Sequence, residues 1–333
     1  MLDPKLLDQI IDVAAKAAYK SSLLKGKGDK NTADQAAVDA MRTELNNMNI
    51  CGKVVIGEGE MDEAPMLYIG EILGKTKEPK IDIAVDPLDG TKLAANNQPN
   101  AISVISISEE GQLLQAPDTY MDKISVGPNL PDNIVDLDED IKKNIENLAK
   151  AKNKNVKDIC ICMLERDRHK HYIDGAKSLG SKLKLISDGD VAGSIFSALK
   201  NSEVDMYVGI GGAPEGVLAA SAIKCLGGQF QARLKIEDDD EVTRAKKLGI
   251  TDFKKKYFLN DIVKGDVIFC SSGVTDGELV SGIKIDDYKY HSETFALHYS
   301  QKFFQKVKKT YNIWNITLFK KKSGLLKHLI KIH

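Results

Sequence analysis

The chain has 333 residues, with 47 lysines and arginines against 48 aspartates and glutamates and a formal net charge of −1. With 42% hydrophobic and 29% charged residues, its composition is that of a globular protein and excludes a disordered or fibrous one. No apolar run approaches the roughly 20 residues of a membrane-spanning helix, so no membrane partner is expected.

The N-terminal part predicts two helices followed by strands. Apolar residues at helical spacing over 7–18 predict the first helix. Thr32 and Gln35 fit a capping box, which predicts a second helix with Asp34 in its first turn, where the helix dipole favours a negative charge. Strand-like runs follow at 53–57, 81–86 and 101–107.

A charged amphipathic helix over 138–152 indicates a domain boundary near residue 150. Beyond it strands and helices alternate, which predicts a largely parallel sheet covered by helices. The expected strands are 158–164, 182–186, 205–210 and 266–270, and the expected helices are 170–179, 191–199, 215–226 and 241–248. The acidic run Glu237–Glu241 is interpreted as the solvated start of a helix. The expected fold class is α/β, with an α+β half over 1–150 and an α/β half over 151–310.

Five cysteines form an odd set without the spacing of a disulfide framework. Cys160 and Cys162 are two residues apart in an alternating stretch, so both are expected to face one side, most often a core face. The N-terminal residues are too charged for a signal-peptide core. We therefore expect a reduced, cytoplasmic protein.

The near-zero net charge conceals an asymmetry. Nine lysines and no acid lie between Tyr299 and His333, so the first 298 residues carry a net charge of −10. An acidic body either only aids solubility or gathers carboxylates that hold cations for an anionic ligand, and composition does not choose between these. The end of the chain, 311–333, is interpreted as a basic extension without a catalytic role.

Four segments that follow predicted strands combine glycines with charged residues. They are 85–91, 164–168, 187–190 and 209–216. Turn chemistry explains each glycine singly, but not the acids and arginines beside them. Because ligands of open α/β sheets bind beyond the carboxyl ends of the strands, these segments predict one functional site.

The first segment carries an Asp-Pro-Leu-Asp-Gly-Thr motif over 86–91. Its proline fixes the backbone as the chain leaves the strand, so Asp86 and Asp89 can converge on one point. Hard divalent cations prefer such oxygen donors, and the hydroxyl of Thr91 can bond a water that a cation holds.

Further carboxylates accompany this motif. Glu58 and Asp62 lie in an acidic segment after another predicted strand, and Asp34 lies near Lys30. Since no histidine is near them, ligation by oxygen alone favours Mg²⁺ or Mn²⁺ over structural zinc.

Two other segments are suited to anions. Arg166 and Arg168 can make forked contacts with phosphate oxygens, although a surface ion pair with Asp167 is the alternative. Gly212, before the helix that Pro214 opens, can bring backbone N–H groups against an anion.

The segment Asp188-Gly189-Asp190 supplies carboxylates that can accept hydrogen bonds from sugar hydroxyls. Combined with metal ligands and arginines, it predicts metal-assisted hydrolysis of a phosphate ester on a polyhydroxylated substrate.

These motifs resemble those of the metal-dependent, lithium-sensitive phosphatases. Within that superfamily, the stretches 28–34, 55–71 and 209–216 are similar to those of class II fructose-1,6-bisphosphatases, the bacterial type. The resemblance covers roughly residues 14–310. Inositol monophosphatases share the shorter motif but lack Gly-Glu-Gly-Glu-Met-Asp-Glu-Ala-Pro in this context.

The resemblance implies a layered αβαβα sandwich that hydrolyses the 1-phosphate of fructose 1,6-bisphosphate to fructose 6-phosphate in gluconeogenesis. It implies one metal held by Asp34 and Glu58, and a second held by Asp86, Asp89 and Glu215. This branch commonly has Glu at the position of Asp89, and the shorter side chain could alter metal spacing or preference.

The resemblance also implies roles around the substrate. Thr91 would orient the attacking water, with Lys30 and Asp62 close to the metals. The implied substrate contacts are Asp89, Gly90, Thr91, Tyr120, Arg166, Asp167, Arg168, Asp188, Gly189, Asp190 and Gly212.

Two alternatives remain open at this point. The substrate could be sedoheptulose 1,7-bisphosphate, alone or with the fructose ester, because both share the phosphate end. A noncatalytic sensor of sugar phosphate or metal is a hypothesis of another class. A nucleic-acid partner is not expected, because the lysines lie outside any recognisable module. A homo-oligomer, dimer or tetramer, is expected.

Overall fold

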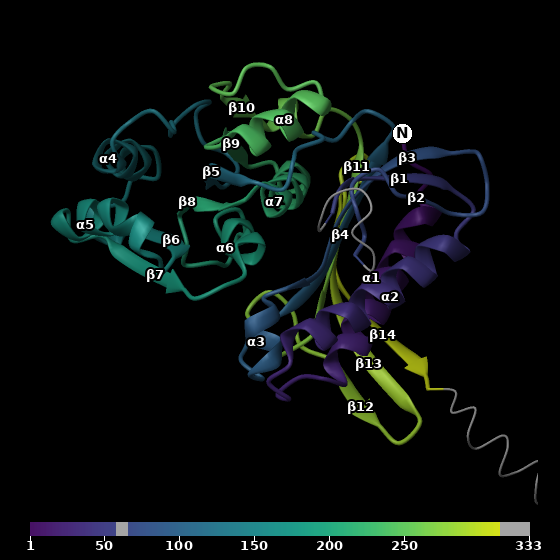
Figure 1. Ribbon diagram of the computed structural model, residues 1–333. Helices are drawn as coiled ribbons and strands as arrows, with labels where there is room; N and C mark the ends of the chain where they lie inside the picture. Colours follow the sequence, from purple (N-terminus) through teal and green to yellow (C-terminus); the bar gives the residue numbers. More distant parts are fainter. Residues whose placement is uncertain (58–65, 314–333) are drawn as a thin grey trace, which may run out of the picture.

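The computed structural model describes residues 1–57 and 66–313 (Figure 1). The predictions for Glu58 and Asp62, and for the extension beyond Ile313, lie outside these residues. Within the described ranges, no helix is both long and apolar enough to cross a membrane.

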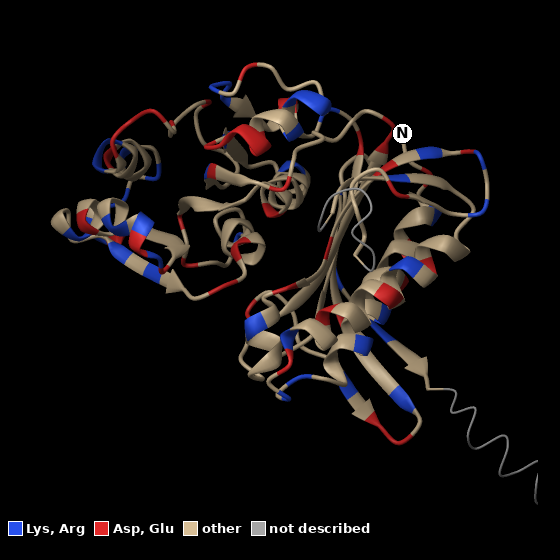
Figure 2. Cartoon of the chain, in the orientation of Figure 1, with Lys and Arg blue, Asp and Glu red and all other residues tan. Residues whose placement is uncertain are grey.

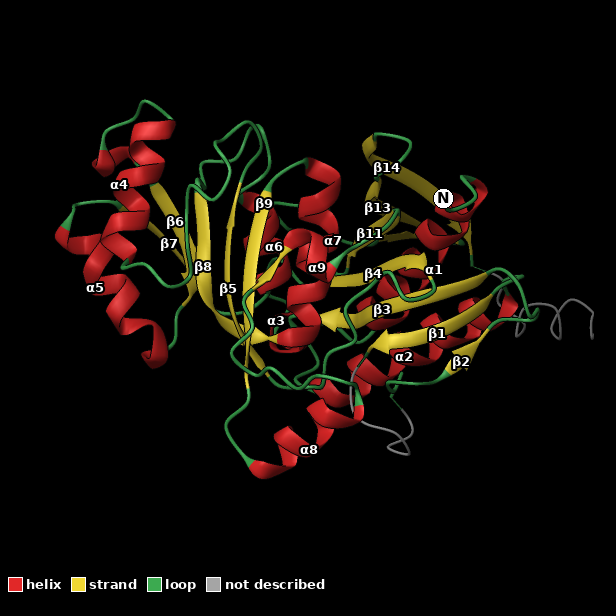
Figure 3. Ribbon diagram, turned by 90° about the horizontal axis from the view of Figure 1, so that it is seen from above, coloured by secondary structure: helices red, strands yellow, loops and turns green. Residues whose placement is uncertain are grey.

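The described residues form five layers, helix–sheet–helix–sheet–helix (Figure 3). One outer layer holds α1 (Lys5–Ser22) and α2 (Lys30–Asn47), the central layer α6 (Asp190–Phe196) and α7 (Ala213–Leu226), and the other outer layer α4 (Ile141–Ala151) and α5 (Lys170–Ser178). The layered α/β fold is confirmed, and each of these helices begins and ends within a few residues of its expected bounds.

The first sheet has the strand order β12-β13-β11-β4-β3-β1-β2, with β14 paired to the other edge of β13. Its strands are β1 (Cys51–Ile56), β2 (Ile72–Leu73), β3 (Lys80–Asp89), β4 (Ile102–Glu109), β11 (Val267–Gly273), β12 (Lys284–Asp286), β13 (Lys289–His298) and β14 (Phe303–Asn312). Its β1 and β3 are parallel, and the other neighbouring strands are antiparallel.

The second sheet has the order β10-β9-β5-β8-β6-β7. Its strands are β5 (Tyr120–Val126), β6 (Cys160–Leu164), β7 (Lys182–Ile186), β8 (Met206–Gly212), β9 (Gln229–Lys235) and β10 (Tyr257–Phe258). Only β6, β7 and β8 are parallel, because β5 lies antiparallel between β8 and β9. The expectation of a largely parallel sheet is therefore wrong.

Residue 150 does not separate the strands of the first sheet from those of the second. Strand β5 precedes that position but pairs in the second sheet, whereas β11 to β14 follow it and pair in the first.

The remaining helical segments are α3 (Thr91–Ala95), η1 (Val156–Asp158), η2 (Asp167–His169), α8 (Asp239–Lys247) and α9 (Leu259–Ile262).

Alternation along the strands builds the core on both faces of the first sheet. Ile83 and Val85 of β3 pack in the cluster beneath α1 and α2, whereas Ala84 packs in the cluster shared with α6 and α7. Period-two alternation thus assigns the even-numbered side chains of β3, before its bulge, to the central helical layer.

The start of α2 differs from the expected capping box. The N-cap is Asp29, whose carboxylate accepts hydrogen bonds from the backbone N–H of Thr32 at 3.0 Å and from its hydroxyl at 2.5 Å. The helix begins at Lys30, so Asp34 lies beyond its first turn. Thr32 supports the true cap, because a hydroxyl at the third helical position can donate back to the N-cap carboxylate.

Several of the C-terminal lysines lie in a regular element. Lys306, Lys308 and Lys309 are on β14, which extends to Asn312, and Lys309 contacts Asp12 of α1 at 2.8 Å. An edge strand with one solvated face accommodates lysines, and their charge hinders pairing with other chains.

Candidate active site

A β-bulge shapes the end of β3. In the pairing with β4, Asp86 lies opposite Val104 and Asp89 lies opposite Ile102. Those two partners are two positions apart and share a face, so Asp86 and Asp89 also share a face, although they are three positions apart. It is the face toward α6 and α7, and both carboxylates are buried.

The turn after the bulge requires glycine. Gly90 has φ +83°, in the left-handed region, and a Cβ there would lie 3.0 Å from Leu93. The chain then enters α3, so Thr91 is the first helical residue after Asp89 and Gly90. Asp86 Oδ1 accepts a hydrogen bond from the backbone N–H of Leu88 at 3.1 Å, which fixes its side chain within the bulge.

The start of α2 is held beside α3. The backbone N–H groups of Gly26 and Gly28 donate to Ala94 and Ala95 at the end of α3, both at 2.9 Å. This connection places the beginning of α2, with exposed Lys30 and half-buried Asp34, on the side of the site formed by α3.

The two arginines brace neighbouring strand ends of the second sheet. Arg166 donates to the carbonyl oxygen of Ser187 at 2.6 Å, and Arg168 donates through Nε and Nη2 to that of Ile210. The guanidinium of Arg168 also lies 4.9 Å from the ring centre of Tyr120 at the start of β5. The segments after β6, β7 and β8 are therefore brought together as expected.

His169 was not anticipated from the sequence, and its hydrogen bonds connect the ends of β6 and β8. Its ring is fully buried, with Nδ1 2.7 Å from the carbonyl of Leu164 and Nε2 accepting the backbone N–H of Ile210 at 2.7 Å. Because Nε2 accepts, the proton is on Nδ1 and the ring is neutral. Burial lowers the pKa of His169 and so favours this neutral form.

The end of β8 presents Glu215. A Cβ on Gly212 would lie 1.9 Å from Glu215 Oε2, so the carboxylate folds directly against a position that only glycine can occupy. Burial, and next the charge of Asp190, raise the pKa of Glu215 to about 7.

The β7–α6 connection faces the end of β3. Asp89 Oδ2 lies 4.0 Å from where a Cβ on Gly189 would be, and both segments carry acidic residues (Figure 2). Burial, followed by the charges of Asp190 and Asp188, raises the pKa of Asp89 well above its usual range. The carboxylates of Asp188 and Asp190 differ, because Asp188 is half-buried and Asp190 is buried in an ion pair with Lys123.

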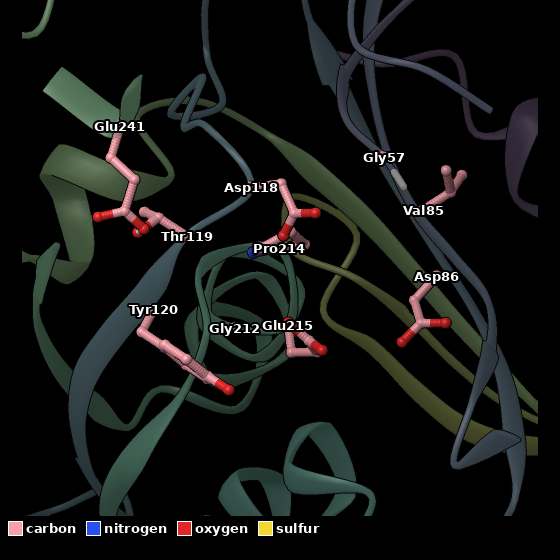
Figure 4. Close-up of a pocket in the computed structure, with 10 residues that line it drawn as sticks. All are labelled: Gly57, Val85, Asp86, Asp118, Thr119, Tyr120, Gly212, Pro214, Glu215 and Glu241. Carbon is pink, nitrogen blue, oxygen red and sulfur yellow. The ribbon is translucent and has the colours of Figure 1, made fainter. Parts of the chain in front are cut away.

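A cavity of about 450 Å³ lies between these segments (Figure 4). Asp86 faces it from the first sheet, and Glu215 and Tyr120 face it from the other side. Its lining residues are Gly57, Val85, Asp86, Asp118, Thr119, Tyr120, Gly212, Pro214, Glu215 and Glu241.

Sequence reasoning missed part of this wall. Asp118 and Thr119 belong to no motif, and the acidic run of α8 was interpreted only as a helix start. That helix does begin there, with Asp238 as its N-cap, but Glu241 turns to the cavity and contacts the hydroxyl of Thr119 at 2.6 Å.

The donor set fits a hard divalent cation. Asp89 Oδ2 is buried and has no hydrogen-bond partner within the described part of the chain. Burial without a partner is energetically unfavourable for a carboxylate oxygen, and a bound cation would remove this cost. Across residues 1–57 and 66–313, no three acidic, histidine or cysteine side chains are gathered as a ready-made metal cluster. The expected ligand Glu58 lies outside those ranges.

Comparison with known proteins identifies the family of the chain. A family model described as bacterial fructose-1,6-bisphosphatase, glpX-encoded, matches residues 4–311. The chain is 43% identical over 289 residues to fructose-1,6-bisphosphatase 1 class 2 of Escherichia coli K12, covering 83% of this chain and 84% of that protein.

A second relative carries two activities in its name. It is the D-fructose 1,6-bisphosphatase class 2/sedoheptulose 1,7-bisphosphatase of Trichodesmium erythraeum, 39% identical over 301 residues, covering 83% of this chain and 87% of that protein. With the family model spanning nearly the whole chain, these similarities show that it belongs to the bacterial class II fructose-1,6-bisphosphatases, a family of metal-dependent phosphoric monoester hydrolases.

Proposed function

We propose that this site releases the 1-phosphate of fructose 1,6-bisphosphate as inorganic phosphate, leaving fructose 6-phosphate, with Mg²⁺ or Mn²⁺ bound by oxygen ligands. The observation that carries the proposal is the geometry of the β3 bulge. It holds Asp86 and Asp89 on one face, with Asp86 across a cavity from Glu215. One buried oxygen of Asp89 has no hydrogen-bond partner among the described residues.

Two ligand sets follow from this arrangement and the family resemblance. Asp86, Asp89 and Glu215 would hold one ion, and Asp34 with Glu58 the other. Such ions, when bound, lower the pKa of a coordinated water and offset charge on the phosphate and the leaving oxygen.

The chain itself would orient the reacting groups. Thr91, at the first position of α3, accepts a hydrogen bond from the attacking water and directs its oxygen at phosphorus. As that oxygen bonds to phosphorus, the bond between phosphorus and O1 of the sugar breaks. The water gives up one proton and O1 takes up one, so the products are inorganic phosphate and the sugar alcohol. No protein nucleophile is required, and Lys30 and Asp62 would act close to the metals, as the family resemblance implies.

The second sheet would bind the rest of the substrate. Arg168 uses Nε and Nη2 for Ile210, which leaves the Nη1 hydrogens for an anion. Arg166, Asp167 and Tyr120 border the same region, so a second phosphate has cationic donors there. Asp188 is the more accessible carboxylate for sugar hydroxyls and lies beside Gly189, whereas the space beside Gly212 holds the Glu215 carboxylate.

A phosphate-release panel tests this function. The full chain is assayed with fructose 1,6-bisphosphate, sedoheptulose 1,7-bisphosphate and inositol monophosphate, each with Mg²⁺, Mn²⁺ and Li⁺. We expect release from fructose 1,6-bisphosphate with Mg²⁺ or Mn²⁺. No release with either metal would refute the proposal.

A matched pair of variants on one strand sharpens the test. Asp86→Asn should abolish release, whereas Asp82→Asn should retain it. Asp82 is equally buried on β3 but accepts the backbone N–H of Leu113 at 3.1 Å, away from the cavity. Equal losses in both variants would show that folding, not the site, is affected.

Sedoheptulose 1,7-bisphosphate is the second candidate substrate, favoured by the name of the Trichodesmium relative. Release from both esters at similar kcat/KM would establish dual activity.

We also propose a cytoplasmic location, supported by five free cysteines. We further propose a dimer or tetramer, which light scattering of the purified chain would reveal.

A further inference from the structure

Lys123 is a buried lysine at the centre of the site region. It lies on β5, and its side chain is 1% exposed. Its ammonium group lies 2.5 Å from Asp190 Oδ2 and donates to the carbonyl oxygen of Gly212 at 3.0 Å. Burying an ammonium is costly unless it is paired and hydrogen-bonded, so the fold holds this group for a reason other than packing.

Two glycines make the space that Lys123 occupies. A Cβ on Gly211 would lie 2.8 Å from the lysine Nζ and 2.1 Å from Asp190 Oδ2, and a Cβ on Gly216 would lie 3.2 Å from the lysine Cδ. Gly211 belongs to β8, which ends at Gly212, and Gly216 belongs to α7, which follows it. The lysine is therefore enclosed by the same turn that carries Glu215.

The two partners of Lys123 belong to different site segments. Asp190 is the first residue of α6 and ends the segment with Asp188, and the hydroxyl of Tyr207 is 3.3 Å from its Oδ2. Gly212 ends β8 and contacts the Glu215 carboxylate. One ammonium group thus joins the segment proposed to bind sugar to the turn proposed to hold metal.

We propose that Lys123 is a positioning residue that fixes Gly212 and Asp190 relative to each other, and so sets the affinity for divalent metal at Glu215 and for the sugar bisphosphate. It would act through these two partners rather than by contact with metal or substrate. The substrate part of this inference rests on the proposed function, whereas the metal part does not. Groups that orient metal ligands typically change metal affinity by about 10- to 100-fold when removed.

The test compares two buried lysines. In Lys123→Met we expect Mn²⁺ affinity, measured without sugar by titration calorimetry, to fall at least about tenfold, and KM for fructose 1,6-bisphosphate to rise. Lys224→Met is the control. Lys224 lies on α7, is 6% exposed and bonds Asn260 and Val263, remote from the cavity lining. We expect this control to lower the melting temperature and to leave Mn²⁺ affinity within twofold.

Lys123→Arg separates geometry from charge and serves if the methionine variant does not fold. It keeps the charge, but the planar guanidinium cannot occupy the space between Gly211 and Gly216 as an ammonium does. Weakened Mn²⁺ binding in this folded variant supports positioning, and affinity equal to the parent overturns it. A parent that binds Mn²⁺ but releases no phosphate would refute the proposed function alone.

Discussion

Asp89 is a residue at which stability and function conflict. It is 5% exposed, its Oδ2 has no hydrogen-bond partner within the described residues, and three further carboxylates raise its pKa together with burial. Without a cation this carboxylate is unfavourable to the fold. Such costs are retained in enzymes where the strained group serves the reaction.

Replacing Asp89 by Asn should therefore have opposite effects on the two properties. We expect kcat for phosphate release to fall about 100-fold or more, because the variant lacks a carboxylate that we propose as a metal ligand. We expect the melting temperature of the metal-free protein to rise by about 2 °C, because like-charge repulsion is relieved. Calorimetry in chelator measures the second effect, and a lower melting temperature would contradict it. Asp89→Glu, which keeps the carboxylate, should retain metal-dependent turnover.

His169 couples the site region to pH through a single tautomer. It accepts from Ile210 and donates to Leu164, so protonation would place a second proton against the Ile210 N–H. Arg168, His171 and Asp122 are the charged or titratable groups that act on it, and burial is the main reason that its pKa is lowered.

This arrangement predicts a loss of stability in mild acid. Because the folded-state pKa lies below the unfolded value of about 6.5, the contribution of His169 is complete above pH 6.5. It declines as pH falls below 6.5, since only the unfolded chain gains the proton there. Urea unfolding at pH 7.5 and 5.5 should show a smaller decline in His169→Gln, whose neutral amide can replace both hydrogen bonds. An equal decline in parent and variant would contradict this account.

At the scale of single elements, the cap of α2 can be tested directly. Asp29→Ala removes the acceptor for both the N–H and the hydroxyl of Thr32, and should lower the free energy of unfolding by about 1 kcal/mol. Thr32→Ala should cost less, because the N–H bond to Asp29 persists. Chemical unfolding measures both, and a larger loss in Thr32→Ala would favour the capping box that the sequence suggested.

The elements that could be predicted are those whose pattern reflects burial alone. Strand β7 and helix α5 follow hydrophobic periodicity and lie within a residue of their expected bounds. Strands β5 and β14 could not be recognised. In β5 the buried charge of Lys123 interrupts the apolar pattern of a strand. In β14, an edge strand, the lysines give the composition of an unstructured tail.

The same distinction applies to the site. The Asp86–Thr91 motif could be found because each residue type is demanded by chemistry at one turn. The supporting residues Lys123, His169 and Glu241 could not, because they act from separate elements through contacts that only the fold creates. Functional loops can be recognised from sequence motifs, whereas the side chains that position them cannot.

At the scale of the whole molecule, the site joins parts of the fold that are otherwise packed through α6 and α7. Asp86 and Asp89 come from the first sheet, whereas Glu215 comes from α7, the helix that follows β8 of the second sheet. A cation held by all three would therefore link the layers, and its binding to the native state alone would stabilise the whole molecule.

We expect Mn²⁺ at 100 times its dissociation constant to stabilise the parent by about 2.7 kcal/mol and to raise its melting temperature accordingly. In Glu215→Gln most of this increment should be lost, since one of the three proposed ligands is replaced by a weaker neutral donor. Glu241→Gln is the matched control, because Glu241 lines the same cavity but is engaged with Thr119. Differential scanning fluorimetry with and without Mn²⁺ measures all three proteins. A parent-like shift in Glu215→Gln, or its loss in Glu241→Gln, would show that the cation is held by other carboxylates of this cavity.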